Sequence, residues 1–439
     1  MDPTAPDPAR SPRVSSLTGT AAVDVADVIC LGESMVTFLP SRPGRLADVP
    51  SFARAIGGAE SNAACALAAA GHRVKWVSRV GTDGFGDHLI EAIAAYGVDT
   101  SAVGRDPLRP TGVYFRTATD RAADAHEVVY YRRGSAASAM SPATVPYQEL
   151  AGTRVLHISG ITAALSADCL ALMRELTTRR PGRPLVSFDV NHRPGLWRDA
   201  SGARVLLELA RGADLVFVGE DEAEAAWGVH GAAAIREALP EPAVVVVKQG
   251  AKGATVFAKS APRPGDAASA PWPGDAASAL RPGDAASAPP AGPESAPPAG
   301  PRGDGHANSA PPAIEERGPG QSPGTSPHLH GAQPPGGANP PDTITFAPAP
   351  RVDVTAPVGA GDAFAAGYLS GLLRALPTRD RLRHGHLWAA AALTVPGDLA
   401  RPPAAAHADR LAALDDAAWE RLRLGPGWTS AADEEVRTP

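Results

Sequence analysis

Apolar residues along this chain fall into short runs separated by longer stretches of helical character. Four of the runs lie in the middle of the chain: Val155–Ser159, Leu185–Asp189, Leu215–Val218 and Val244–Lys248. A short apolar run is typical of a strand covered on both faces, and the intervening helical stretches suit crossovers between parallel strands. The pattern therefore predicts an α/β fold with a central, mostly parallel sheet flanked by helices on both faces.

The flanking parts of the chain add further strands and two helices. We expect strands at Val25–Leu31, Val36–Leu39, Val74–Val80, Thr111–Thr117 and Glu127–Arg132, and helices at Ser61–Ala70 and Gly86–Tyr96. The segments 111–117 and 127–132 alternate in the way that antiparallel strands do. Thr255–Ala258 and Thr343–Ala347 are expected to pair as a hairpin, and a long connection at a hairpin tip costs little free energy.

Residues 260–341 form that connection and differ from the rest of the chain in composition. Pro, Gly, Ala, Ser and Asp dominate, and the heptapeptide PGDAASA begins at Pro264, Pro273 and Pro282. Because this segment has so few large apolar residues, it cannot bury enough surface to offset its chain entropy. We therefore predict a disordered insertion, and an interaction arm is the alternative. The remaining divisions are a disordered tail at 1–24, one domain at 25–259 and 342–410, and a C-terminal helix and tail at 411–439.

Composition narrows the classes of function. The 439 residues carry a net charge of −6, which argues against a protein that binds nucleic acid or a membrane surface. The three cysteines, Cys30, Cys65 and Cys169, are too widely spaced for a disulfide framework or a zinc site, and the simple interpretation is a cytoplasmic protein. We expect no membrane span, because no apolar run approaches about 20 residues, and no signal peptide at the N-terminus.

The segment Gly359-Ala-Gly-Asp362 carries the most chemical information. It separates a strand-like run from an Ala-rich helical run. Glycines allow a sharp turn, and the free N–H groups of the following helix would point at a ligand there and favour an anion. A carboxylate at such a place makes sense if Asp362 accepts a proton from a hydroxyl that attacks a phosphate. The alternative is an ordinary first-turn aspartate.

Other polar clusters follow predicted strands, where ligands bind in an open parallel sheet. They are Gly57–Asn62, Asp189–Arg193, Lys248–Gly253 and Tyr130–Arg133. The first suits sugar hydroxyls, the second and third suit metal-associated or phosphate contacts and a nucleotide, and the last suits a substrate carboxylate. Each cluster also has a structural explanation that fits about as well. Gly57–Asn62 could be a helix cap, Asp189–Arg193 a structural network, Lys248–Gly253 a plain hairpin turn, and Tyr130–Arg133 a charged strand edge.

The joint order of these clusters resembles the PfkB/ribokinase family of carbohydrate kinases over about residues 25–259 and 342–410. Gly57–Ala64 and Val77–Gly86 resemble the N-terminal signature of that family, and Ala356–Gly367 resembles its C-terminal signature. Within the family, the segments Thr111–Tyr114, Tyr130–Ala136, His157–Thr162 and Asp189–Arg193 are most similar to 2-dehydro-3-deoxygluconate kinases. The resemblance implies a ribokinase-like fold with a small β-sheet lid, built from about residues 39–56 and 111–133.

The resemblance also implies roles for individual residues, with ATP and Mg²⁺ as cofactors. Contacts with a small-molecule sugar or sugar acid are implied for Gly58, Ala59, Glu60, Ser61, Asn62, Tyr114, Tyr130, Tyr131, Arg132 and Asp398. Contacts with ATP are implied for Asn191, His192, Arg193, Lys248, Gln249, Gly250, Ala251, Lys252 and Gly253, together with the Gly359–Asp362 turn. The catalytic set is Asp362 as the base, Gly359, Ala360 and Gly361 as amide donors, and Arg193. No protein ligand of the metal is assigned, and a homodimer through the lid is implied by relatives.

One departure from the family pattern concerns Ala356, where relatives usually carry an acid that helps to bind a monovalent cation. The expected reaction is direct transfer of the γ-phosphoryl group of ATP to a primary hydroxyl, with 2-dehydro-3-deoxy-D-gluconate as the first candidate acceptor. A kinase for a neutral sugar such as fructose or ribose, a catalytically silent sugar-binding regulator, and a scaffold acting through residues 260–341 are the alternatives.

Overall fold

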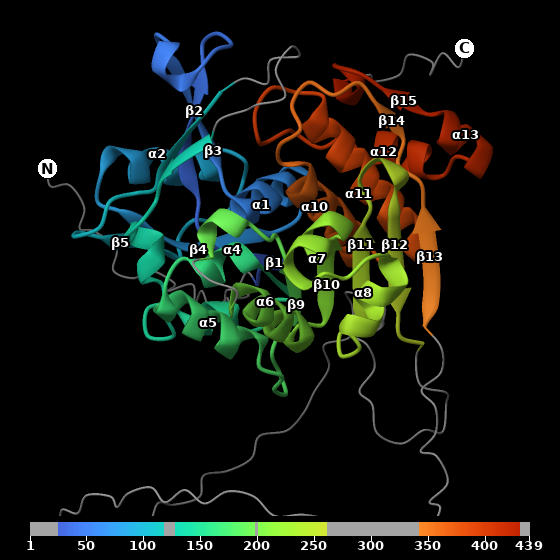
Figure 1. Cartoon of the computed structure of the whole chain (residues 1–439), viewed down its shortest axis with the longest axis horizontal. Coiled ribbons are helices and arrows are strands. Elements are labelled where there is room, and N and C mark those ends of the chain that lie inside the picture. The colour runs from blue at the N-terminus through green and yellow to red at the C-terminus, as the bar shows by residue number, and fades with distance from the viewer. Residues whose placement is uncertain (1–24, 118–127, 198–200, 261–341, 431–439) are drawn as a thin grey trace, which may run out of the picture. The chain divides into compact units, whose positions relative to one another are not determined.

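A computed structural model describes residues 25–117, 128–197, 201–260 and 342–430. A nine-stranded sheet with the order β13-β12-β11-β10-β9-β8-β1-β4-β5 forms the centre of this part of the chain (Figure 1). Its strands are β1 (Val28–Leu31), β4 (Val74–Gly81), β5 (Val103–Asp106), β8 (Val155–Ser159), β9 (Leu185–Asp189), β10 (Leu215–Gly219), β11 (Val244–Lys248), β12 (Ala254–Ala258) and β13 (Thr343–Ala347). The seven strands β5, β4, β1, β8, β9, β10 and β11 pair in parallel with their neighbours, and β12 and β13 are antiparallel additions at one edge. The predicted fold class is confirmed.

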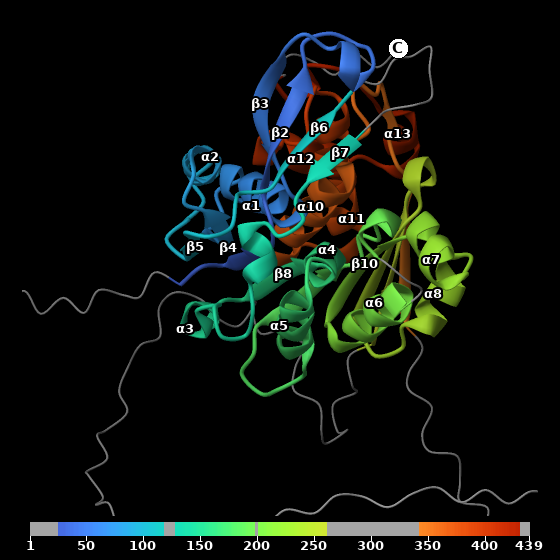
Figure 2. The same ribbon diagram turned by 60° about the vertical axis from the view of Figure 1, so that its left-hand side comes forward.

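Helices cover both faces of this sheet (Figures 1 and 2). One face packs against α1 (Ala59–Ala69), α2 (Gly84–Ala94), α10 (Ala360–Leu373), α11 (Thr378–Leu393), α12 (Ala405–Ala412) and α13 (Asp416–Arg421). The other packs against α3 (Tyr147–Leu150), α4 (Gly160–Ala164), α5 (Ala167–Thr177), α6 (Ser201–Gly212), α7 (Glu220–Trp227) and α8 (Ala232–Ala238). Alternate residues of one strand enter different cores, Val246 the first and Val247 the second, because side chains alternate along a strand. This explains why the strands appear as unbroken apolar runs.

A separate four-stranded sheet, which we call the lid, contains β2 (Met35–Pro40), β3 (Phe52–Gly57), β6 (Val113–Arg116) and β7 (Val128–Tyr131) in the order β3-β2-β6-β7 (Figure 2). The predicted antiparallel pairing of β6 with β7 is confirmed, while β2 and β6 are parallel. Strand β3 was not predicted, because alanine at two of its six positions gives a weak strand signal. Residues 118–127 lie outside the described part of the chain.

The segments around the predicted insertion and at the C-terminus refine the expected divisions. Strands β12 and β13 pair as the predicted hairpin, and residues 261–341 between them lie outside the described residues, as do 1–24 and 431–439. A boundary at residue 410 would cut through α12. Trp419 of α13 is fully buried and donates its indole N–H to the Pro348 carbonyl oxygen at 2.8 Å, so residues up to 430 complete the core.

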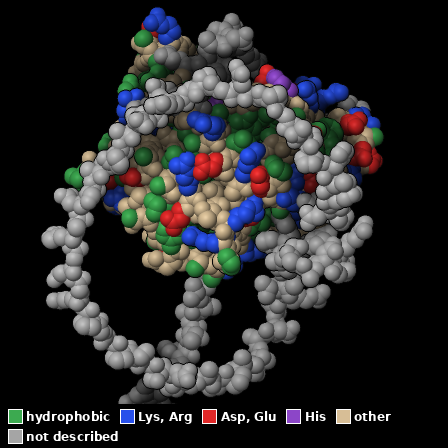
Figure 3. All heavy atoms as spheres, turned by 60° about the horizontal axis from the view of Figure 1, so that its bottom comes forward, with side chains coloured by type: hydrophobic (Ala, Val, Ile, Leu, Met, Phe, Trp, Pro, Cys, Tyr) green, Lys and Arg blue, Asp and Glu red, His purple; other side chains and the backbone are tan. Residues whose placement is uncertain are grey.

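The surface seen in Figure 3 mixes side chains of both charges. Lys and Arg side chains alternate with Asp and Glu side chains over this face, and no continuous basic tract is visible in that view. Within the described residues, no helix combines the length and apolar character needed to cross a membrane.

Candidate active site

Asp362 lies in the first turn of α10, where the sequence placed a catalytic carboxylate. Gly359 precedes the helix with a φ of +76°, a conformation that glycine adopts readily. The Asn62 side-chain amide donates to Asp362 Oδ2 at 3.0 Å, and the Asn191 amide donates to Oδ1 at 3.5 Å. Three segments far apart in the chain therefore meet at this carboxylate.

The electrostatic surroundings of Asp362 suit a group that accepts a proton near neutral pH. Burial raises its pKa to about 6, the hydrogen bond from Asn62 opposes that rise, and the negative charge of Asp189 adds to it. Asn191 has a φ of +42°, which is uncommon for a residue with a side chain and is typical of strained functional positions. The two asparagine amides hold the Asp362 carboxylate in a fixed orientation.

A buried ion pair lies beside this turn. The Lys248 ammonium is 3.0 Å from both carboxylate oxygens of Asp189, whose side chain is 3% exposed. A Cβ atom added to Gly361 would lie 3.6 Å from Lys248 Nζ, so the ammonium borders the catalytic turn. Burial lowers the pKa of Lys248, but Asp189 and then Glu222 more than offset it and leave the pKa raised to about 12.

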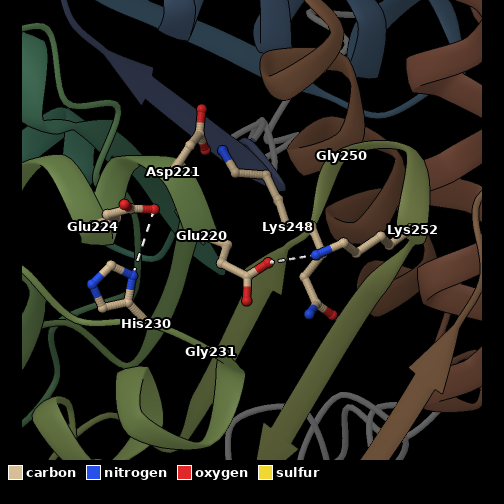
Figure 4. A pocket seen from close by; sticks show the side chains of 9 residues that line it. Glu220, Asp221, Glu224, His230, Gly231, Lys248, Gly250 and Lys252 are labelled. Carbon is tan, nitrogen blue, oxygen red and sulfur yellow. Dashed lines mark ion pairs between the residues drawn. The ribbon is translucent and has the colours of Figure 1, made fainter.

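A pocket of about 400 Å³ opens next to Lys248 (Figure 4). Its lining comes from the α7 N-terminus, the segment before α8 and the turn between β11 and β12: Glu220, Asp221, Glu224, His230, Gly231, Lys248, Gln249, Gly250 and Lys252. Four residues of the predicted nucleotide-side turn therefore line this pocket, but Ala251 and Gly253 are not part of the lining. Gly253 instead packs closely on β13, because a Cβ there would lie 2.3 Å from the Ala347 carbonyl oxygen.

Tyr114 and Asp398, for which sugar contacts are predicted, meet where the lid approaches the main domain. The Tyr114 hydroxyl of β6 donates to Asp398 Oδ2, and Arg116 Nη1 lies 3.0 Å from Asp398 Oδ1. Tyr130 of β7 pairs with Tyr114, and their ring centroids are 5.4 Å apart. Arg116 was missed in the sequence, although it shares a strand face with Tyr114 because it follows two residues later.

The prediction that Tyr131 contacts the sugar together with Tyr130 does not fit the structure. Adjacent residues on a strand point to opposite faces. Tyr131 is 64% exposed and contacts Phe115 edge-to-face at 6.0 Å. It lines a different pocket, of about 330 Å³, with Leu46, Phe52, Phe115 and Val129.

Arg132 is largely buried and is paired with a carboxylate. Its guanidinium forms an ion pair with Glu33 and lies 5.8 Å from the ring centroid of Tyr130. Glu33, which is fully buried, also accepts a hydrogen bond from the Ser135 hydroxyl at 2.5 Å. Glu33 was not among the predicted site residues, although it directly follows the first strand.

Residues at the start of α1 differ in what they contact. One of them reaches the Asp362 carboxylate, and the others pack behind it. Asn62 reaches Asp362. Gly58 is the N-cap of the helix and Ala59 is its first residue. A Cβ on Gly58 would lie 2.4 Å from the Glu33 carbonyl oxygen, so the backbone passes close to Glu33 there. Ser61 is fully buried and donates to the Ser34 hydroxyl at 2.9 Å. Ser61 therefore supports the site from behind, which corrects its prediction as a sugar contact.

Glu60 is likewise turned away from the site. Its Oε1 accepts hydrogen bonds from the Ser159 amide and hydroxyl at 3.1 and 2.7 Å and from the Thr162 hydroxyl at 3.0 Å. Burial raises its pKa to about 7. A Cβ on Gly32 would lie 2.1 Å from this carboxyl group, so the glycine makes room for it. The sugar contact predicted for Glu60 is replaced by a buried anchoring role.

Arg193 lies at the edge of the site rather than inside it. Its side chain is 52% exposed, and its Nη1 is 3.1 Å from the His192 carbonyl oxygen and 3.5 Å from Glu222 Oε1. Glu222 was missed in the sequence. It accepts a hydrogen bond from the Gly219 amide at 2.8 Å and so caps α7 where β10 ends, at the same edge of the sheet as Asp189 and Lys248.

Comparison with known proteins shows the family to which the chain belongs. The model of the pfkB family of carbohydrate kinases matches residues 25–270 and 338–405. The 2-dehydro-3-deoxygluconokinase of Bacillus subtilis is 38% identical over 212 residues, which are 46% of this chain and 63% of that enzyme. Fructokinase-2 of Solanum habrochaites is 28% identical over 53% of this chain and 72% of its own length. A crystal structure of a PfkB protein from Polaromonas sp. JS666 superposes with a TM-score of 0.60 at 28% identity, covering 85% of this chain and 98% of that one.

Proposed function

Because this chain belongs to the pfkB family of carbohydrate kinases, we propose that it transfers the γ-phosphoryl group of ATP to the primary hydroxyl of a sugar or sugar acid. The acceptor that we propose is 2-dehydro-3-deoxy-D-gluconate, and the product is its 6-phosphate. The observation that carries the proposal is Asp362, oriented by two asparagine side chains at a helix N-terminus beside a buried lysine. The 38% identity to the 2-dehydro-3-deoxygluconokinase of Bacillus subtilis supports this choice of acceptor, although the match spans only 63% of that enzyme's length.

Asp362 would act as the general base. The acceptor oxygen attacks the γ-phosphorus as its proton passes to the Asp362 carboxylate, which is ionised above a pKa of about 6. The amide groups of Gly359, Ala360 and Gly361 face the charge that grows on the phosphoryl oxygens. Arg193 would join them only after leaving Glu222, with which it is paired at 3.5 Å.

Mg²⁺ would enter with the nucleotide. No group of three or more metal-ligating side chains occurs within the described ranges, and Mg²⁺ bound to ATP needs only one or two protein oxygens because phosphates and water complete its shell. Glu222, which is largely buried at the head of α7, is the carboxylate that we assign to this role, directly or through water. Mg²⁺ supplies charge neutralisation on the phosphates, and the part played by Glu222 is to hold it in place.

The choice of acceptor depends on the lid. Tyr114, Tyr130 and Arg132 extend toward the sugar side, and Arg132 is the residue that we assign to the carboxylate of a sugar acid because a planar guanidinium matches it. One observation supports the alternative of a neutral sugar. Arg132 is already paired with the buried Glu33, so the charge of its guanidinium is neutralised before substrate binds. The similarity to a fructokinase points the same way.

A panel of substrates separates these possibilities. Purified full-length protein is mixed with ATP, Mg²⁺ and one acceptor at a time: 2-dehydro-3-deoxygluconate, fructose, ribose and gluconate. The proposal predicts that kcat/KM is highest for 2-dehydro-3-deoxygluconate. A preference for fructose would establish the neutral-sugar kinase instead. If ATP is not consumed with any acceptor of the panel, both proposals are refuted. Binding without turnover would favour a silent regulator.

The outer face of the lid suits a second copy of the chain. Phe38 and Phe115 stack with centroids 4.6 Å apart, Phe52 meets Phe115 edge-to-face at 5.3 Å, and the exposed Tyr131 borders them. We therefore extend the proposal to a homodimer through the lid, because a cluster of half-buried aromatic rings bordered by the exposed Tyr131 is typical of an interaction surface. Sedimentation of the wild-type chain tests it: a dimer that Tyr131→Asp converts to a monomer is expected, and a wild-type monomer contradicts it.

A further inference from the structure

Two cationic side chains lie near the catalytic turn, and they differ in burial. Arg193 is half-exposed and directed at Glu222, whereas Lys248 is largely buried and borders Gly361. We propose that Lys248 is the catalytic cation that stabilises the phosphoryl group during transfer, and that Asp189 is a positioning residue that holds it in place. This inference rests on the proposed kinase function and assigns a role that the sequence had given to Arg193.

The sheet explains how the two residues reach each other. Asp189 ends β9 and Lys248 ends β11, with β10 between them. Gly219 of β10 lies opposite Lys248 in the parallel register, so no side chain stands there between the lysine and Asp189. The alkyl chain of Lys248 can therefore cross the end of β10, and its ammonium arrives at both oxygens of Asp189 at 3.0 Å.

The position of Lys248 joins the two halves of the reaction. The same side chain lines the pocket of about 400 Å³ (Figure 4). Its ammonium also borders Gly361 of the Gly359–Asp362 turn. In the transfer, the acceptor oxygen forms a bond to the γ-phosphorus and its proton goes to Asp362. The bond from phosphorus to the bridging oxygen breaks, and its electron pair leaves on ADP. A fixed ammonium beside the three remaining oxygens favours the charge they carry in the transition state.

Asp189 holds and compensates the Lys248 ammonium before nucleotide binds. An unpaired ammonium in a buried place is costly, so the lysine needs a partner before ATP binds. Asp189 supplies the charge, and because it is 3% exposed its carboxylate cannot turn away into water. With its pKa raised to about 12, Lys248 keeps its proton throughout the neutral range.

The test compares Lys248→Met with the double variant Asp189→Asn/Lys248→Met. The single variant leaves a lone buried carboxylate near Asp362, so it combines the loss of the cation with an electrostatic disturbance. The double variant is uncharged at both positions and isolates the cation. We expect kcat to fall by about 100-fold or more in both, as for removal of one donor to a developing oxyanion. Lys259→Met is the matched control. Lys259 directly follows β12 and pairs with Ala243 just before β11, at the opposite end of that strand from Lys248.

The pH profile and ligand binding separate catalysis from support. The charged neighbours of Asp362 are Asp189, Arg193, Lys248 and, more distantly, Glu60. In Lys248→Met the acidic limb of kcat/KM should move to higher pH, and in the double variant it should return while kcat stays low. By calorimetry, the double variant should bind ADP like wild type but bind ADP with aluminium fluoride and sugar less tightly.

Recovery of wild-type kcat in the double variant would overturn the inference, because Lys248 would then only neutralise Asp189. Equal loss of affinity for ADP and for the aluminium fluoride complex would overturn it too, since that result marks plain nucleotide binding. If the wild-type chain phosphorylates no acceptor, the proposed function fails and this inference fails with it. If the wild-type chain is an active kinase and the double variant keeps wild-type kcat, only the inference about Lys248 fails. Thermal unfolding confirms that each variant is folded before it is scored.

Discussion

Replacing Gly359 by alanine is expected to disable the catalytic turn, for a reason visible in the structure. Gly359 has a φ of +76°, and a Cβ atom there would lie 2.0 Å from the Asp398 carbonyl oxygen, where ordinary contact begins at 3.4 Å. The turn and the Asp398 segment must therefore move apart by about 1.4 Å, the difference between these distances. A displacement of about 1 Å at reacting groups costs on the order of 100-fold in rate.

The same substitution also affects stability, and a second glycine separates the two effects. Alanine in the left-handed region costs about 1–2 kcal/mol. Gly182 has a φ of +77° and no atom within 4 Å of its Cβ position, so Gly182→Ala introduces the same backbone strain without the collision. It lies in the turn after α5, away from the residues of the site. Both variants should lose a few degrees of Tm, but only Gly359→Ala should lose turnover.

The assay is kcat at saturating ATP and sugar for both variants, alongside thermal unfolding. We expect Gly359→Ala to lose about 100-fold in kcat and Gly182→Ala to stay within a factor of about two. Near-wild-type kcat in Gly359→Ala would show that the turn tolerates displacement, and the reasoning from close approach would be refuted. An equal loss of kcat in Gly182→Ala would trace the effect to stability instead.

Three further substitutions probe the base and the lid. Asp362→Asn should lower kcat by about 10²–10⁴-fold with ATP binding retained; in the wild type, kcat/KM should fall as pH drops through about 6, because the base is protonated below its raised pKa. Wild-type turnover in the variant, or a flat profile down to pH 5, would contradict this role. Arg132→Gln should raise KM for a sugar acid far more than for fructose, and equal changes would refute the carboxylate assignment. Arg116→Gln leaves the buried Asp398 without its cation, so both Tm and kcat/KM should fall; unchanged values would show that the pair at 3.0 Å contributes nothing.

Much of the main domain could be predicted because its strands are covered on both faces. Each of β8 to β11 is a short apolar run, and β8, β9 and β11 end in the polar residues Ser159, Asp189 and Lys248, so one pattern locates both the strand and the edge at which ligands bind. Strand β3 of the lid was missed for the opposite reason. Two of its six residues are exposed and two more are half-buried, and the alternation of alanine with larger residues carries little signal.

The division of labour within each motif could not be predicted. Asn62, Ser61 and Glu60 are adjacent, and only the direction of a helix face decides that Asn62 reaches Asp362 while Glu60 reaches Ser159. The contacts that define the site also span long separations: Asn62 and Asp362 are 300 residues apart. No local pattern contains such a contact, and a segment outside the described residues lies between its two partners.

Asp398 gives these distant pieces a common point. Its carbonyl oxygen packs against Gly359 at the start of the catalytic turn, while its carboxylate accepts the Tyr114 hydroxyl and pairs with Arg116 of the lid. A movement of β6 must therefore act on the segment that fixes Gly359. A buried ion pair resists separation more strongly than an exposed one, because each partner would be left uncompensated. The position of the sugar-side lid and the geometry of the phosphate-side turn are thus linked through one residue, so changes in the lid should alter kcat as well as KM.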